Sequence, residues 1–169
     1  MTNAARGLFS SDFSMYLNRV PVIARHFHSV RAIDELPRTL PVRHFVIVNL
    51  SPRHHSGSHW LVILRSQKDT IEIFNSLGFQ NLAQIRPYLN FNFRTHLTYN
   101  NTAFQLSSSS SCGLYCIYYV VFRLLNLDMD FEEVLDEIFC SNKVENENKV
   151  AKFCQHLLNI SNESDLYDF

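Results

Sequence analysis

The sequence predicts an α+β fold, in which a mostly antiparallel sheet packs around one central helix with further helices at its flanks. Before residue 107, short β-branched runs alternate with turn-forming stretches, a pattern typical of strands. After the serine run Ser107–Ser111, apolar residues recur at helical spacing, and the first of these segments is apolar on most faces. A helix of that kind belongs in the middle of a domain. We expect a single domain over residues 1–169.

The elements before the serine run follow from apolar runs and the residues that interrupt them. We expect a helix from Ser10 or Ser11 to Pro21, strands over Phe45–Leu50, Trp60–Leu64 and Ile71–Phe74, a helix over Asn81–Leu89 and a strand over Thr95–Tyr99. Turn-like stretches at 51–58 and 66–70 separate the first three strands. This spacing suits an antiparallel meander.

The elements after the serine run are all expected to be helices. Gly113–Asn126 is the segment that is apolar almost all round, and Asp130 can cap a helix that runs to Phe139. Lys143–Ile160 carries Val150, Phe153, Leu157 and Leu158 on one stripe, which predicts an amphipathic helix.

The composition excludes several classes of protein. Hydrophobic residues make up 46% and charged residues 18%, as in globular chains, and the formal net charge of −1 argues against a dedicated nucleic-acid binder. No apolar run approaches the roughly 20 residues of a membrane span, and residues 1–9 lack the apolar core of a secretory signal. With only 4 cysteines, all at or after residue 112, the sequence does not indicate a disulfide scaffold, so we expect reduced thiols in an intracellular compartment.

Cys112 stands at the junction between the polar serine loop and the buried helix. The free amides and aligned peptide dipoles of a helix start favour an anion, so a thiol there should have a lowered pKa and be reactive. Taken alone, Cys112 is better interpreted as a small buried hydrophobe, as most free cysteines are. We interpret Cys116, Cys140 and Cys154 in that way.

Three further residues give Cys112 a chemical context. His59 opens a strand after a loop, where a general base can face a nucleophile. If the strands at His59 and Asn75 pair as a hairpin, the amide oxygen of Asn75 can accept the imidazole N–H and fix its tautomer. Gln105, seven residues before Cys112, can fold back along the loop as an oxyanion donor. Each also has an ordinary interpretation, as a surface histidine, a turn asparagine and a polar loop residue.

The order His-Trp, Asn, Gln and Cys-Gly resembles the adenovirus cysteine proteases, the adenains of peptidase family C5. Their clan also holds the SUMO-specific Ulp and SENP enzymes. The similar segments are His59-Trp60, residues 73–79 and residues 112–116, with Ile47-Val48-Asn49 upstream. The gap between Gln105 and Cys112 matches the adenain spacing, and the resemblance covers about residues 45–120.

This resemblance implies a thiol endopeptidase that cleaves viral precursor proteins during virion maturation. It implies that Cys112 is the nucleophile, that His59 moves the proton, and that Asn75 orients His59. Gln105 and the backbone N–H of Cys112 would hold the oxyanion. No cofactor is needed for such chemistry. The resemblance further implies polypeptide substrates, an activating peptide from a capsid protein, and a location in the host-cell nucleus and the virion.

The chain departs from the adenain pattern in two respects. Adenains place Glu or Asp where this chain has Asn75, and a neutral amide orients histidine without stabilising the imidazolium by charge. Adenains are also longer and more basic, and DNA raises their activity. The nearly neutral charge of this chain puts a DNA activator in doubt, whereas a peptide that adds to a sheet edge needs no charge excess.

Two other functions stay open at this point. An isopeptidase of the same clan, acting on ubiquitin-like modifiers, would use the same four residues. A catalytically weak, protease-like binding domain, or a metal-binding fold that uses Cys112, Cys116 and a nearby histidine, would come from a different class. Metal binding is the weaker of these, because no second CxxC or histidine pair at ligand spacing completes four ligands.

Overall fold

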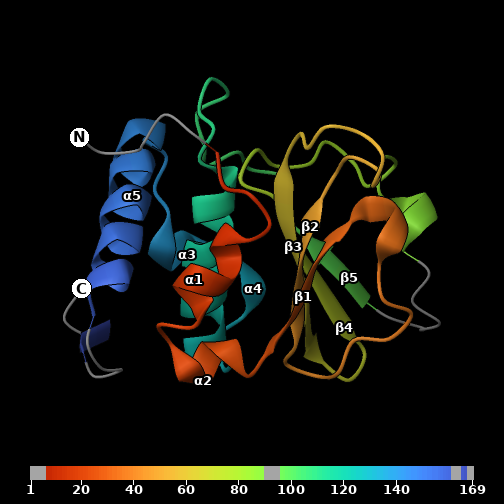
Figure 1. The fold of residues 1–169 in the computed structure, drawn as a ribbon, viewed down its shortest axis with the longest axis horizontal. Coiled ribbons are helices and arrows are strands. Elements are labelled where there is room, and N and C mark those ends of the chain that lie inside the picture. Colours follow the sequence, from red (N-terminus) through yellow and green to blue (C-terminus); the bar gives the residue numbers. More distant parts are fainter. Residues whose placement is uncertain (1–6, 90–95, 161–164, 167–169) are drawn as a thin grey trace.

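The computed structural model describes residues 7–89, 96–160 and 165–166, and over these ranges it shows a sheet of five strands beside a layer of helices (Figure 1). The strands are β1 (Phe27–Ala32), β2 (Phe45–Asn49), β3 (Trp60–Gln67), β4 (Thr70–Phe74) and β5 (His96–Tyr99). They lie in the sheet in the order of the sequence. The helices are α1 (Asp12–Leu17), α2 (Pro21–Ala24), α3 (Cys112–Leu125), α4 (Phe131–Ile138) and α5 (Lys143–Asn159).

The predicted meander forms the centre of the sheet, but the sheet as a whole is mixed. β2 and β4 both pair with β3 in antiparallel fashion, as expected. The two outer pairings, β1 with β2 and β4 with β5, are parallel. The expectation of a mostly antiparallel sheet is therefore wrong at both edges. Parallel neighbours need a long connection, and such a connection leaves no hairpin signal in the sequence.

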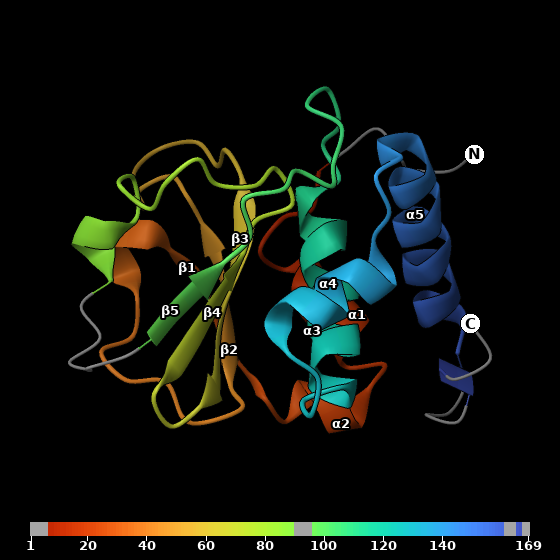
Figure 2. The ribbon, with the colours of Figure 1, turned by 180° about the vertical axis from the view of Figure 1, so that it is seen from behind.

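The central helix is confirmed. α3 lies between the sheet and α5, with α1 and α4 on opposite sides of it, as the views from both sides of the molecule show (Figures 1 and 2). It contacts β3, α1, α4 and α5. α4 and α5 begin and end within one residue of the predicted ranges, and α4 starts with a capping box in which the backbone N–H of Asp130 donates to Glu133. No helix of the described residues has both the length and the hydrophobicity to cross a membrane.

Three local expectations needed correction. The predicted helix at 81–89 is reduced to a 3₁₀ turn over Arg86–Tyr88, because Pro87 has no N–H for a continuing helix. Pro21 does not only end α1; it also occupies the first turn of α2, where a missing N–H costs nothing. β1 was not expected at all. Of the strand predicted at 95–99, residue 95 lies outside the described residues, and the remainder is β5.

Apolar side chains cover both faces of the sheet. One core joins the helices to one face of the sheet, with Phe13, Phe74, Tyr119 and Phe153 fully buried. A second core lies on the opposite face under the segments at 33–40 and 79–89, where turns and two short 3₁₀ helices, Ile33–Glu35 and Arg86–Tyr88, cover the strands. All five residues of β2 are buried, which explains why this strand is a continuous apolar run.

One buried ion pair ties α3 to the sheet. Arg123 donates from Nε and Nη2 to the carboxylate of Glu72 on β4, both at 2.8 Å, and the two side chains are each 3% exposed. The hydroxyl of Tyr119 donates to the same carboxylate at 3.0 Å. The bidentate geometry with a third donor satisfies a charge that would otherwise be costly to bury.

Candidate active site

The predicted site residues lie at one end of the molecule, where β2 and β4 end and β3 and α3 begin (Figures 1 and 2). His59 directly precedes β3, Asn75 directly follows β4, and Cys112 is the first residue of α3. Antiparallel pairing of β3 with β4 places the start of one strand beside the end of the other. Chain segments that are far apart in the sequence therefore meet at one end of the central strands.

The structure brings His59 and Asn75 into contact. The ring nitrogen Nε2 of His59 lies 2.6 Å from Oδ1 of Asn75. The carbonyl of His59 accepts a hydrogen bond from the backbone N–H of Leu50 at 2.9 Å, so the neighbouring strand also holds this residue. His59 is thus held both at its ring and at its backbone carbonyl. The contact with Asn75 fixes the orientation of the ring, as a partner of a general base must do.

The amide of Asn75 has a defined orientation. Its Oδ1 accepts from the backbone N–H of Leu77 at 3.0 Å, and its Nδ2 donates to the carbonyl of Gly78 at 2.9 Å. Gly78 has φ +71°, and a Cβ there would collide with the carbonyl of Asn101, so this tight turn requires glycine. With Oδ1 facing His59, the Nε2 atom carries the proton, and Nδ1 of the neutral ring is left as the acceptor.

Asn100 secures the backbone of the same turn. Its Oδ1 accepts from the N–H of Asn75 at 2.9 Å, and its Nδ2 donates to the carbonyl of Asn75 at 2.7 Å. Asn100 is 2% exposed. Sequence reasoning missed this residue, because nothing in the segment after β5 shows that it reaches back to the end of β4.

Cys112 is 8% exposed, and burial raises the pKa of its thiol above the ordinary value. Backbone N–H groups of Trp60, Gly113 and Cys112 itself oppose this shift. The sequence led us to expect a lowered pKa at the helix start. That expectation is wrong in direction, because the loss of water around the thiolate outweighs the donors that face it.

The pKa of His59 moves in the opposite sense. Burial lowers it, and the hydrogen bond to Asn75 offsets part of the effect. A raised thiol pKa and a lowered imidazole pKa both favour the uncharged forms. In the resting protein the arrangement is therefore a neutral thiol and a neutral imidazole.

Gln105 lies deeper than the sequence suggested. It is 1% exposed, its Oε1 accepts from the hydroxyl of Ser76 at 2.6 Å, and its Nε2 donates to the carbonyl of Ser109 at 2.9 Å. Among the described residues that line the cleft beside Cys112, Gln105 is absent. The amide is held firmly, with one of its two N–H groups engaged by the serine loop.

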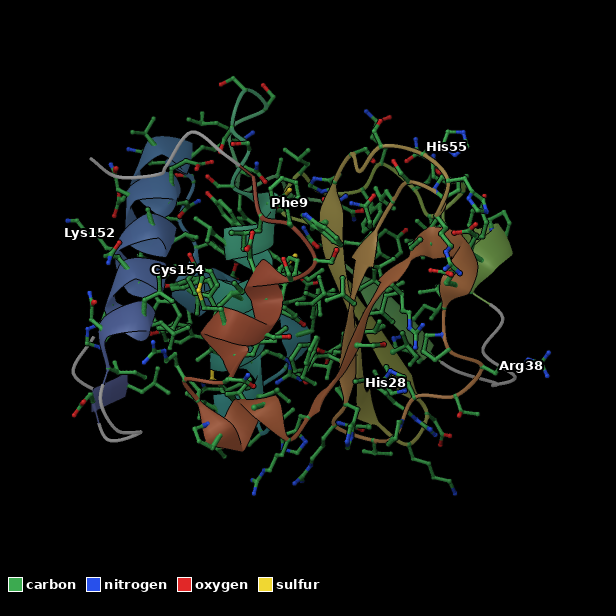
Figure 3. All side chains as sticks on the ribbon, viewed as in Figure 1. Phe9, His28, Arg38, His55, Lys152 and Cys154 are labelled. Carbon is green, nitrogen blue, oxygen red and sulfur yellow. The ribbon has the colours of Figure 1, made fainter. Side chains whose placement is uncertain are left out.

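A cleft of about 810 Å³ contains both His59 and Cys112 in its lining. The segment Gly7–Ser10 forms part of one wall, and sequence reasoning missed it. The carbonyl of Leu8 accepts from Nε1 of Trp60 at 3.0 Å, and a Cβ on Gly113 would lie 2.9 Å from Cβ of Leu8. The segment thus packs against the neighbours of both His59 and Cys112. Figure 3 labels Phe9 on this segment, near the junction of helices and sheet.

The remaining cysteines have no site around them. Cys116 and Cys154 are buried and unpaired, and burial raises the pKa of both thiols. Within the described ranges, no three His, Cys, Asp or Glu side chains gather as metal ligands. A metal site built on Cys112 and Cys116 therefore lacks the third ligand it needs in this part of the chain.

The model of the adenovirus endoprotease family matches residues 39–169, which is most of the chain and includes His59, Asn75, Gln105 and Cys112. The chain belongs to this family. The protease of snake adenovirus serotype 1 is 30% identical over 95 residues, and the match covers 46% of each protein. The protease of bovine adenovirus 7 is 28% identical over 89 residues and covers 44% of each. The chain thus matches less than half the length of these two adenovirus relatives.

Solved structures share the fold at low sequence identity. ChlaDub1 from Chlamydia trachomatis matches the whole chain and 95% of its own length, with a TM-score of 0.61 and 14% identity. The match to the ASFV protease covers 69% of this chain and 45% of the ASFV protein, with a TM-score of 0.44 and 21% identity. The first of these matches supports the arrangement of sheet and helices described above.

Proposed function

We propose that this chain is a cysteine endopeptidase of the adenovirus endoprotease type, with Cys112 as nucleophile and His59 as general base. The observation that carries the proposal is the 2.6 Å bond between His59 and Asn75, together with the cleft that both His59 and Cys112 line. Membership of the family supports the same activity. A nucleophile and a base in one cleft, with an orienting group bonded to the base, are the parts that thiol proteolysis requires.

In the proposed reaction, the resting pair is uncharged and the proton moves as the bond forms. Nδ1 of His59 accepts the proton of the Cys112 thiol while the sulfur attacks the scissile carbonyl carbon. The tetrahedral intermediate then collapses, the imidazolium gives its proton to the leaving amine, and an acyl-thioester remains on Cys112. His59 next takes a proton from water, which attacks the thioester. The acid product leaves, and the proton returns to the thiolate.

The oxyanion of both tetrahedral intermediates needs donors. We propose the backbone N–H of Cys112 and the second N–H of the Gln105 amide, the first being bonded to Ser109. The firm hold on Gln105 from Ser76 and Ser109 supports this role, because an oxyanion donor contributes most when it is fixed before the reaction.

The biological setting follows from family membership and is part of the proposal. The substrates are polypeptides, specifically viral precursor proteins that are cut during virion maturation, in the infected cell nucleus and in the virion. An activating peptide from a capsid protein could add to β1 or β5, which are the outer strands of the sheet among the described residues. The chemistry itself requires no cofactor, and the net charge of −1 gives no support to activation by DNA.

Substitution of the nucleophile tests the proposal. Cys112→Ala should abolish cleavage of a peptide that ends in a fluorogenic amide after Gly-Gly, with an unchanged melting temperature. Cys140→Ala is the matched control and should keep most activity, because this thiol is half-buried beside Asn146 and lies outside the cleft. Residual activity in the Cys112→Ala variant, or equal loss in the control, would contradict the assignment. A ubiquitin-like fusion, assayed in parallel, separates a modifier-specific isopeptidase from an endopeptidase.

A further inference from the structure

A carboxylate on α5 reaches the loop that joins Gln105 to Cys112. Oε1 of Glu147 accepts from the backbone N–H of Leu106 at 3.2 Å, and Oε2 accepts from the hydroxyl of Ser109 at 2.9 Å. Figures 1 and 2 both show the start of α5 at the same end of the molecule as the start of α3. One side chain from a distant helix thus contacts two residues of the loop 106–111, Leu106 and Ser109.

Ser109 connects Glu147 to both ends of this loop through further hydrogen bonds. Its Oγ accepts from the backbone N–H of Ser111, the residue before the nucleophile, at 3.1 Å. Its carbonyl accepts from Nε2 of Gln105 at 2.9 Å. A continuous chain of hydrogen bonds therefore runs from Glu147 through Ser109 to Gln105 on one side and to the start of α3 on the other.

A second side chain, Tyr115 on α3, also reaches this loop. The hydroxyl of Tyr115 is near this carboxylate, and burial together with Glu147 raises the pKa of Tyr115 far above its ordinary value. The neutral phenol donates to the carbonyl of Phe104 at 3.3 Å. Residues 104, 106 and 109 of the loop are thus held by side chains from α3 and α5.

We infer that Glu147 is a positioning residue for the oxyanion donors, acting through Ser109 on Gln105 and on the start of α3. The inference rests on the proposed function. A run of five serines offers few apolar contacts of its own to fix a loop. Oxyanion donors must nevertheless be fixed within a few tenths of an ångström of the developing charge. Glu147 supplies what the loop sequence lacks.

Two measurements on one set of variants test this role. The first is the rate at which iodoacetamide alkylates Cys112, followed by peptide mapping; this displacement forms no oxyanion. The second is the affinity of a short Gly-Gly peptide aldehyde, which adds to the thiol and places an oxyanion against the donors. Glu147→Ala should weaken aldehyde binding by about 10-fold, since complete loss of one oxyanion donor costs about 10²–10³-fold in rate. Alkylation should stay within about twofold.

Matched variants make the result specific. Glu145→Ala removes the same charge from an exposed position on the same helix and should change neither measurement. Glu147→Gln keeps one acceptor oxygen and should bind the aldehyde with intermediate affinity. Ser109→Ala breaks the same chain of bonds in the loop and should reproduce the loss even if Glu147→Ala folds poorly.

The outcomes distinguish a failure of this inference from a failure of the proposed function. Wild-type aldehyde affinity in Glu147→Ala or Ser109→Ala, or an equal fall in alkylation and aldehyde binding, overturns the positioning role alone. If Cys112→Ala binds the aldehyde as well as the wild-type protein, the proposed function and the inference both fail.

Discussion

At the scale of single residues, His59 and Asn75 form a pair that carries no net charge at rest. Burial lowers the pKa of His59, and Asn75 supplies a hydrogen bond without a negative charge to counter that shift. Since burial also raises the pKa of the Cys112 thiol, the proposed mechanism has proton transfer accompany the attack rather than precede it.

The lowered pKa of His59 predicts activity that persists in mild acid. A base with a depressed pKa stays neutral to a lower pH, so the acidic limb of kcat/KM should fall below pH 6.5, the ordinary value for histidine. A pH–rate series on the peptide substrate measures this limb. His54→Gln, at an exposed position in the loop before His59, should leave the profile unchanged. An acidic limb above pH 6.5 would contradict a lowered pKa of His59.

Substitutions of Asn75 separate orientation from charge. Asn75→Ala removes the partner of Nε2 and should lower kcat by about 10²-fold, the scale of general-base catalysis. Asn75→Asp keeps an acceptor and adds a charge, so the pKa of His59 should rise and the acidic limb should move to higher pH. The new carboxylate oxygen would face the carbonyl of Gly78, which now accepts from Nδ2, so this variant should also melt at a lower temperature. Equal pH profiles for Asn75→Asp and the wild-type protein would remove Asn75 from the site.

At the scale of elements, the N-terminal segment and α3 fit closely. Gly113 in the first turn of α3 faces Leu8, and there is no room between them for a methyl group without movement. Glycine in a helix is ordinarily less stable than alanine by about 1 kcal/mol, so its presence here has a packing reason.

This contact predicts that a glycine-to-alanine substitution in α3 destabilises the protein, opposite to its usual effect in a helix. Gly113→Ala should lower the melting temperature despite the better helix propensity of alanine, because Leu8 must move away from Trp60 and Gly113. Leu8→Ala costs some packing on its own, but the double variant should melt higher than the sum of the two single changes predicts. Thermal unfolding of the four proteins in the cycle measures this coupling. If the two changes in melting temperature simply add, Leu8 and Gly113 do not interact.

What the sequence could predict at this scale depended on local signals. The central strands, α3, α4 and α5 have clear apolar periods, and the hairpin of β3 and β4 was enough to bring His59 to Asn75. β1 escaped notice because its residues are only partly buried at the sheet edge, and its parallel pairing with β2 leaves no turn signal. The contacts of Leu8 with Trp60 and of Glu147 with Ser109 join segments far apart in the chain. No pattern within either segment encodes such contacts.

At the scale of the whole molecule, the sheet and the helical layer are joined across their interface by charge as well as by apolar packing. Arg123 and Glu72 are both nearly inaccessible to water. Removing one partner of a buried pair leaves the other charge without compensation, whereas a neutral replacement of both is often tolerated.

This pair predicts a large effect of a single substitution. Arg123→Met should lower the free energy of unfolding by about 3–5 kcal/mol, and Glu72→Gln in the same chain should restore part of it, since a neutral amide can still accept from Tyr119. Arg53→Met, which breaks the exposed pair with Glu35, is the control and should change stability by less than about 1 kcal/mol. Denaturant titration measures all three. Equal losses in Arg123→Met and Arg53→Met would contradict the role of burial.

The same ion pair also limits which parts of the molecule can move. Arg123 lies near the end of α3, and Cys112, the proposed nucleophile, lies at its start, so the helix cannot slide along the sheet without separating opposite charges in a dry interior. A substrate or activator that widens or narrows the cleft must therefore act through the surrounding loops, at 51–58 and 106–111, and through the segment at 7–10. In the proposed protease, the Cys112 thiol thus keeps a fixed position, and adjustment to different polypeptides occurs in the loops around it.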